Sequence, residues 1–188
     1  MKTVLLAGLL AMTAPAFAQD AASADTHGIY AGIGATHSDH EWMSGKSTNV
    51  KLFGGYDFNE HWGIELGTSK IGSFSFSYSD PSNLSQQSTL RGRSSYIAAK
   101  FTTALTDKLS IQSKLGLAHT SVKYHFVTSG VPGPLDLSRS DNGVYVGLGL
   151  KYRLTPKVAL LLEAERNGKQ VHSGMKNEAV SLNASFSF

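Results

Sequence analysis

Residues 143–154 read GVYVGLGLKYRL, a stretch in which large apolar side chains occupy every second position. The positions between them hold glycine, lysine, arginine and one tyrosine. Successive side chains of a β-strand point to opposite faces of the sheet, so this pattern indicates a strand with one apolar face. Residues 178–188 repeat the alternation, with serine and asparagine on the second face. Because no helical period competes in either stretch, the sequence predicts an all-β protein.

The same alternation predicts eight strands whose connections alternate in length. The strands are expected at 28–37, 48–58, 61–71, 93–105, 109–122, 143–154, 157–167 and 178–188. The short connections are 59–60, 106–108 and 155–156, and the long polar ones are 38–47, 72–92, 123–142 and 168–177. A soluble sandwich has no reason to sort its loops, whereas outer membrane barrels have short periplasmic turns and long extracellular loops. We therefore expect an eight-stranded antiparallel up-and-down transmembrane β-barrel.

The two faces of these strands support a membrane barrel over a soluble one. One face carries the large apolar residues, and the other carries glycines and charges, as expected for lipid outside and a narrow lumen inside. The outward set includes Ile29, Ile33, Leu52, Tyr56, Trp62, Ile64, Leu66, Phe101, Leu115, Leu148, Leu160 and Leu162. Aromatic residues near the short turns and the C-terminus predict a periplasmic girdle. They are Tyr56, Phe58, Trp62, Tyr152, Phe186 and Phe188.

The N-terminus and the overall composition define the compartment. Residues 1–18 combine a positive start, an apolar run and Ala16-Phe17-Ala18, which predicts a cleaved signal peptide and a barrel domain at 19–188. The apolar run is too short to span a membrane as a helix. The chain has no cysteine, and its net charge of +3 comes from scattered residues, which argues against a nucleic-acid partner. The expected location is the outer membrane of a Gram-negative bacterium.

Charged residues on the lumen-facing set predict an internal ion network, because buried charges must be paired or hydrated. The set is Lys51, Glu65, Lys100, Lys114, Lys151, Arg153, Glu163 and Glu165, with Asp57 on the same face. Pairing between neighbouring strands would place Glu65 between Lys51 and Lys100. It would also place Glu163 beside Lys151 and Arg153. Eight strands leave room only for side chains, so the network is expected to fill the lumen.

Three stretches resemble the transmembrane domain of the outer membrane protein A family and the related small barrels of OmpX type. They are 52–67 (LFGGYDFNEHWGIELG), 99–110 (AKFTTALTDKLS) and 146–158 (VGLGLKYRLTPKV). The resemblance covers nearly all of the expected mature chain, including strand count and turn positions. It implies that Phe188, with Phe186 before it, is the signal read by the barrel-assembly machinery. The chain ends at the eighth strand, so peptidoglycan anchoring is not expected.

The resemblance also implies a narrow channel as an alternative function. In that family an interior glutamate paired with basic residues acts as a gate, and Glu65 and Lys114 match this pattern. Leu161 and Lys151 stand where the family carries an arginine and an acid. We favour a structural network over a gate.

Two further clusters contain residue types that carry chemistry, and the first of them makes a lipid-A-modifying barrel enzyme a second alternative function. His119 and Ser121 share the outward face of one strand, as in barrels that deacylate lipid A. A hydrolase would also need an acid to orient the imidazole, and no acid occupies the outward positions expected beside them. His37, Asp39, His40 and Glu41 could form a metal cluster, but their spacing is typical of a polar loop. No catalytic residue, metal or cofactor is expected.

The third expected strand continues outward past the bilayer, and its outward set is expected to run unbroken from Trp62 to Tyr78. Lys70 would reach the outer headgroups, and Phe74, Phe76 and Tyr78 would form an exposed aromatic row, which is typical of a contact surface. The sequence thus predicts a monomeric, non-enzymatic barrel with a structural or surface-interaction role. Its partners would be outer membrane lipids, lipopolysaccharide and a surface ligand that the sequence does not identify.

Overall fold

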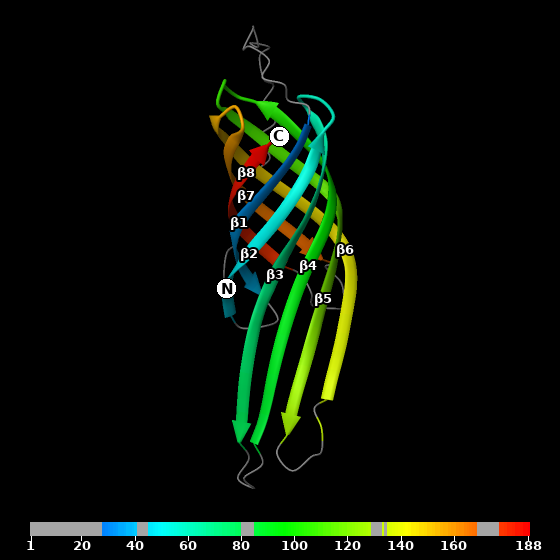
Figure 1. Cartoon of the computed structure of the whole chain (residues 1–188). Coiled ribbons are helices and arrows are strands. Elements are labelled where there is room, and N and C mark those ends of the chain that lie inside the picture. Colours follow the sequence, from blue (N-terminus) through cyan, green and yellow to red (C-terminus); the bar gives the residue numbers. More distant parts are fainter. Residues whose placement is uncertain (1–27, 41–44, 80–84, 129–132, 134, 169–176) are drawn as a thin grey trace, which may run out of the picture.

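The computed structural model describes residues 28–40, 45–79, 85–128, 133, 135–168 and 177–188. These residues form one closed antiparallel barrel in which each strand pairs with its neighbour in the chain and β8 closes on β1 (Figure 1). The strands are β1 (Gly28–His40), β2 (Gly45–Asp57), β3 (Trp62–Ser79), β4 (Ser85–Ala104), β5 (Leu109–Thr128), β6 (Leu135–Thr155), β7 (Val158–Gly168) and β8 (Asn177–Ser187). The predicted eight-stranded barrel is confirmed. Among the described residues, no helix is long and apolar enough to cross a membrane.

The three short connections are the tight turns that the sequence predicts, and each is closed by one polar side chain. Asn59 Oδ1 accepts a hydrogen bond from the backbone N–H of Trp62, at 2.8 Å. Thr106 and Thr155 accept in the same way from the N–H groups of Leu109 and Val158, at 3.1 and 3.0 Å. Asn and Thr side chains favour such local bonds to the backbone, which explains why the chain reverses at these residues.

Strand length differs greatly around the barrel. β1, β2, β7 and β8 have 11 to 13 residues, whereas β3 to β6 have 18 to 21. The ranges 72–92 and 123–142, expected to be loops, are therefore mostly strand, and the strands also extend into 38–47. The extra lengths of β3 to β6 leave the barrel together and form a curved sheet beyond its rim (Figure 1). We call this the projecting sheet, comprising 71–79, 85–94, 120–128 and 135–142.

A register shift in β3 overturns the expected unbroken alternation. Lys70 pairs with Arg93, but Gly72 pairs with Gly92, so one extra residue is inserted between them. A one-residue shift exchanges the two faces of a strand. Beyond it, Ser73 shares a row with the outward residue Arg91, and Phe74 shares a row with Leu90. The backbone positions 74, 76 and 78 therefore pair with β4 positions that alternate with the outward residues Arg91 and Arg93, so the expected unbroken row from Trp62 to Tyr78 is interrupted.

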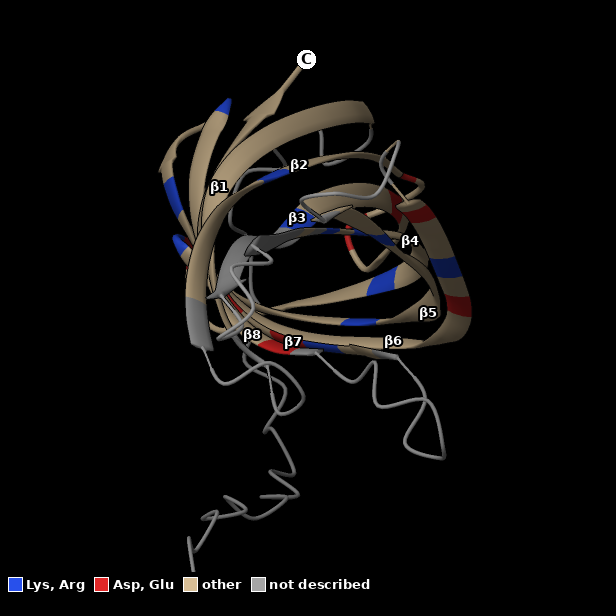
Figure 2. Ribbon diagram, turned by 90° about the horizontal axis from the view of Figure 1, so that it is seen from below, with Lys and Arg blue, Asp and Glu red and all other residues tan. Residues whose placement is uncertain are grey.

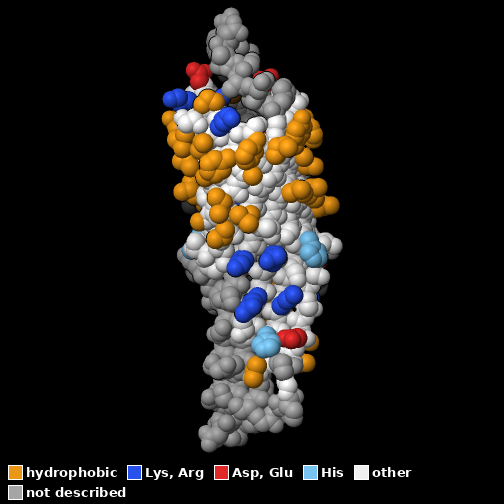
Figure 3. Space-filling view, viewed as in Figure 1, with side chains coloured by type: hydrophobic (Ala, Val, Ile, Leu, Met, Phe, Trp, Pro, Cys, Tyr) orange, Lys and Arg blue, Asp and Glu red, His pale blue; other side chains and the backbone are white. Residues whose placement is uncertain are grey.

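The two faces of the barrel have the predicted chemistry. All twelve residues expected to face outward are at least 37% exposed. Apolar side chains form a belt across the face of the barrel that Figure 3 shows. Lumen-facing glycines make room for large side chains inside. A Cβ on Gly67 would lie 2.4 Å from the Tyr96 ring, so only glycine leaves space for that ring. The core of this protein is thus the lumen, and it is polar.

Candidate functional site

Four aromatic side chains on four strands fill the middle of the lumen. Tyr96 of β4 and Tyr145 of β6 stack with their ring centroids 3.9 Å apart and their planes 3° apart. Tyr30 and Phe53 lie on the β1–β2 side, with centroids 6.5 Å apart. All four are less than 9% exposed. The tyrosines bring hydroxyl groups to the barrel axis, where the charged residues also converge.

Glu163 of β7 is the bridge of the ion network. Its Oε2 lies 2.9 Å from Lys51 Nζ and its Oε1 lies 2.8 Å from Lys114 Nζ. Lys51 also contacts Glu165 at 2.6 Å, and Lys114 contacts Glu65 at 2.7 Å. Bands of both charges face each other across the barrel, with Lys on β2 opposite Glu on β7 (Figure 2). Two ammonium groups therefore serve three carboxylates.

Tyrosine hydroxyls supply the donors that the two lysines lack. Glu65 accepts hydrogen bonds from Tyr30 at 2.9 Å and from Tyr96 at 2.5 Å. Tyr145 donates to Glu165 at 2.7 Å. Burying carboxylates is tolerable only when their oxygens are bonded, and here each of the three has at least two donors. The alternation in residues 143–154 places Tyr145 on the lumen-facing side, but the sequence assigned no role to any of the three tyrosines.

The predicted pairing between neighbouring strands is wrong for most of the network. Glu65 contacts Lys114 instead of Lys51 and Lys100, and Glu163 contacts Lys51 and Lys114 instead of Lys151 and Arg153. The reason is geometric. In a narrow closed barrel, long side chains meet across the axis, so a lysine on β2 contacts a glutamate on β7. The hydrogen-bond ladder between neighbouring strands therefore does not determine the ion pairs.

The remaining lumen charges lie toward the turn end. Lys100 contacts Asp57 at 2.6 Å, and its Nζ lies 3.9 Å from the centre of the Tyr30 ring. Arg153 donates to the backbone carbonyl of Asp107 at 2.8 Å. Lys151 is half-buried and forms no ion pair with any residue that the structure describes. These residues are thus outside the central network.

The central network closes the barrel. Lys51, Glu65, Lys114 and Glu163 are each no more than 3% exposed, although all four are charged side chains inside the barrel. Side chains of Tyr96 and Tyr145 occupy the same level. The paired charges are therefore packed against aromatic rings, an arrangement typical of a structural network.

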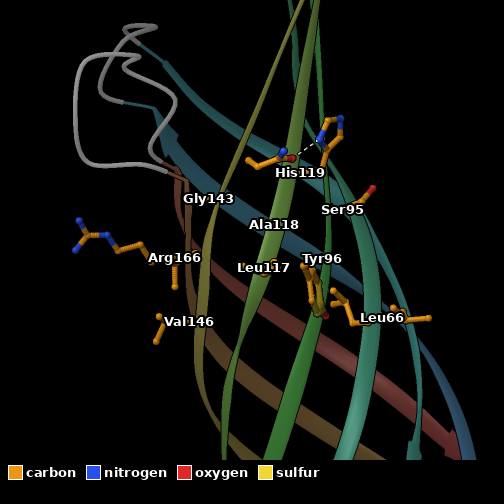
Figure 4. A pocket seen from close by; sticks show the side chains of 12 residues that line it. Leu66, Ser95, Tyr96, Leu117, Ala118, His119, Gly143, Val146 and Arg166 are labelled. Atoms are coloured by element: carbon orange, nitrogen blue, oxygen red, sulfur yellow. Dashed lines mark hydrogen bonds between the residues drawn. The ribbon is translucent and has the colours of Figure 1, made fainter.

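On the outer face, His119 has a partner that the sequence analysis did not assign. Its Nδ1 lies 2.7 Å from Asn142 Oδ1, and the two residues are direct partners on β5 and β6 (Figure 4). An amide can orient an imidazole as an acid does. Ser95 is the partner of His119 on β4, but its hydroxyl bonds Thr68 at 3.0 Å. In the described part of the chain, no hydrogen bond joins the His119 imidazole to the hydroxyl of Ser121 or Ser95.

The other predicted sites are placed as follows. Among the described residues no group of three ligands could hold a metal ion, and Glu41 lies outside them, as does the predicted signal peptide. His37 contacts Thr48 at 3.0 Å. Phe186 and Phe188 are 44% and 80% exposed, and the N–H of Phe188 donates to the carbonyl of Ile29 at 3.1 Å. Their role in assembly stays a prediction.

A closed eight-stranded barrel with an apolar outer belt and a polar, charged interior defines a small outer membrane protein. Residues 4–188 match the profile of the outer membrane protein beta-barrel domain family, and the chain belongs to that family. It is located in the outer membrane of a Gram-negative bacterium and is embedded in lipid. Curated proteins include no sequence match to this chain.

Solved structures of outer membrane barrels have the same fold. Ail, the attachment invasion locus protein of Yersinia pestis, solved in complex with the heparin analogue sucrose octasulfate, is 18% identical with a TM-score of 0.53. That alignment covers 86% of this chain and 97% of Ail. The N-terminal barrel domain of Pseudomonas aeruginosa OprF is 15% identical with a TM-score of 0.56, covering 86% and 99%. Neisserial surface protein A is 16% identical with a TM-score of 0.53, covering 90% and 100%.

Proposed function

We propose that the protein is a closed, non-enzymatic barrel that holds the projecting sheet outside the cell for contact with other molecules or surfaces. The observation that supports this is the unequal strand length within one barrel, 11 to 13 residues in four strands and 18 to 21 in the other four. About 10 tilted residues cross a bilayer. Ten further residues at ~3.3 Å each and ~40° tilt extend about 25 Å beyond the apolar band.

The lumen-side face of the projecting sheet is the proposed contact surface. Tyr124 and Phe126 of β5 stack with ring centroids 6.2 Å apart. Their direct partners on β6, Leu137 and Leu135, are 50% and 58% exposed. Contiguous apolar surface outside the membrane is typical of an interaction site. The rows of this face continue into β3, where the predicted contact residues Phe74, Phe76 and Tyr78 stand.

The test compares cells that carry the wild-type protein with cells that carry a Tyr124→Ser/Phe126→Ser variant. Attachment to cultured epithelial cells and cell–cell aggregation are measured. A Thr89→Ala/Ser138→Ala variant alters the opposite face of the same sheet and serves as the control. The proposal expects attachment or aggregation to fall for the first variant and to persist for the control, with both proteins inserted normally. Wild-type behaviour of the first variant would contradict it.

The lumen network supports a structural role over the channel alternative. A continuous ion path would have to pass Glu163, Lys114 and Lys51, which are mutually paired and almost fully buried. We therefore expect no sustained single-channel conductance from the purified protein in a planar bilayer. Steady ohmic conductance would favour the channel.

A further inference from the structure

The outward face of β3 to β6 changes its chemistry in steps along the strands. Residues that pair directly across strands form rows, and successive outward rows lie two residues apart. In order away from the belt, the rows are Leu66, Ile97, Leu117 and Val144; then Thr68, Ser95, His119 and Asn142; then Lys70, Arg93, Ser121 and Ser140; then Ser73, Arg91, Lys123 and Ser138. The surface therefore passes from apolar to neutral polar to cationic within four rows.

The last two rows contain four cations and no acid. Lys70 is the direct partner of Arg93, and Arg91 is the direct partner of Lys123. We call these four the cationic cluster. All four side chains are exposed, and none forms an ion pair with any residue that the structure describes. Like charges placed directly opposite each other destabilise a sheet, so the arrangement calls for an anion from outside the chain.

The nearest outward carboxylate is already engaged. Asp136, one row further out, lies 2.6 Å from His125 Nδ1. A surface hollow of about 480 Å³ is lined by this pair, including the Asp136 carboxylate, and by Arg91, Lys123 and Ser138. Two of the four cations therefore border a space large enough for a phosphate group and part of its sugar.

An apolar groove lies on the membrane side of the cluster. It has a volume of about 1060 Å³ and runs across the outer face of the barrel, with Leu66, Ile97, Leu117 and Val146 among its lining residues. His119 and Asn142 stand at its polar end (Figure 4). The space-filling view shows Lys and Arg side chains directly beyond the apolar belt on this side of the molecule (Figure 3). The apolar groove and the cationic cluster thus lie next to each other, in the same order as the acyl chains and the phosphates of a lipid.

The height of the cluster matches the outer headgroup layer. From the girdle residue Trp62 to Lys70, eight residues at ~3.3 Å and ~40° tilt rise about 20 Å. From Phe101, the partner of Trp62, the chain reaches Arg91 after a rise of about 25 Å. The hydrocarbon-facing band of an outer membrane barrel is ~25 Å tall. The four cations therefore stand at its upper edge or within about 5 Å below it.

We propose that the outer face of β3 to β5 is a binding site for a phosphate-bearing lipid of the outer leaflet. The phosphates contact the cationic cluster, the polar row bonds the sugar and linkage atoms, and the acyl chains lie in the groove. Guanidinium groups suit phosphate because they donate two parallel hydrogen bonds, and two of the four cations are arginines. The cationic cluster and the groove lie on the opposite face from the proposed contact surface, although Tyr124 and Leu137 of that surface also line the hollow. The inference rests on the cluster and the groove and does not depend on the proposed function.

The test titrates the purified protein in non-ionic detergent with bisphosphorylated lipid A, with the same lipid stripped of phosphate, and with inorganic phosphate. Binding is measured by native mass spectrometry, and lipid-dependent stabilisation by the shift in unfolding temperature. The cluster variant is Arg91→Gln/Arg93→Gln. The control, Lys108→Gln/Lys157→Gln, removes the same charge from the turns at the other end of the barrel. A single Lys123→Gln variant provides a milder second probe.

The proposal expects wild type and control to bind bisphosphorylated lipid A equally and the cluster variant to bind it at least about tenfold more weakly, the factor that one lost charge-assisted hydrogen bond corresponds to. Wild type should bind the stripped lipid at least about tenfold more weakly as well. Lys123→Gln should give an intermediate loss. Equal lipid affinity of the cluster variant and the control would overturn the site. Displacement of the lipid by equimolar inorganic phosphate would assign the cluster to free anions instead. A soluble sulfated polysaccharide is titrated as a further probe. If the cluster variant loses binding to this polysaccharide while its lipid binding stays intact, the lipid assignment is likewise overturned.

Discussion

Separating Glu65 from Lys114 tests whether the lumen network stabilises the barrel as a coupled unit. Lys114 Nζ lies 2.7 Å from Glu65 and 2.8 Å from Glu163, with all three side chains 1% exposed. Glu65→Gln preserves the shape and one acceptor oxygen for the tyrosine hydroxyls, replaces the other oxygen with an NH2 donor, and removes the charge facing Lys114. Breaking a buried pair costs about 3–5 kcal/mol. We expect a loss of about 3 kcal/mol, the lower end, because Lys114 keeps its contact with Glu163.

The reverse change, Lys114→Met, leaves three carboxylates facing Lys51 and should cost about 3–5 kcal/mol. The double variant should be more stable, by about 2 kcal/mol, than the sum of the two single losses predicts. The reason is that each change removes the charge that the other change leaves unpaired. The free energy of unfolding is measured by urea titration in phospholipid vesicles. Glu60→Gln, on an exposed turn, is the control and should change stability by less than about 0.5 kcal/mol. Strictly additive losses, or single variants as stable as the control, would refute the coupled network.

Two further predictions concern packing and assembly. A Cβ on Gly116 would lie 1.9 Å from the carbonyl oxygen of Ile97, so Gly116→Ala should destabilise the barrel by at least the ~1–3 kcal/mol typical of overpacking. A Cβ on Gly54 would lie 3.2 Å from its nearest atom, so Gly54→Ala should be tolerated better. The urea unfolding midpoints of both variants test this difference. Deleting Phe188 should lower the yield of inserted protein and leave unfolded chain in the periplasm, as measured by membrane fractionation. Normal insertion of the truncated chain would count against its role as an assembly signal.

Much of this fold was predictable because a barrel wall repeats one simple rule. Each lipid-facing residue is followed by a lumen-facing one, so strand number, faces and tight turns follow from the period-two pattern and from residues such as Asn59. The projecting sheet was less predictable. Its strands alternate serine and threonine with aromatic or charged residues, a composition that long polar loops share. The ends of β4 and β6 therefore looked like loop.

The candidate sites depended on features that no single strand encodes. The shift beside Lys70 moves Phe74 to the other face, and nothing in the local alternation marks it. The partners of Glu65 and Glu163 depend on which strands face each other across the closed barrel. The cationic cluster combines Lys70 and Arg93, which were expected in strands, with Arg91 and Lys123, which were expected in loops. Only the register across three strands brings these residues together.

Cysteine labelling tests most directly whether the barrel spans the outer membrane with the projecting sheet outside the cell. The chain contains no cysteine, so single introduced thiols report on their own positions. The variants Ser138→Cys in the projecting sheet, Leu148→Cys in the apolar belt and Lys157→Cys in a turn are treated with a membrane-impermeant maleimide. In intact cells only Ser138→Cys should react, and Lys157→Cys should react once the outer membrane is permeabilised. Labelling of Leu148→Cys or Lys157→Cys in intact cells, with Ser138→Cys protected, would contradict the account.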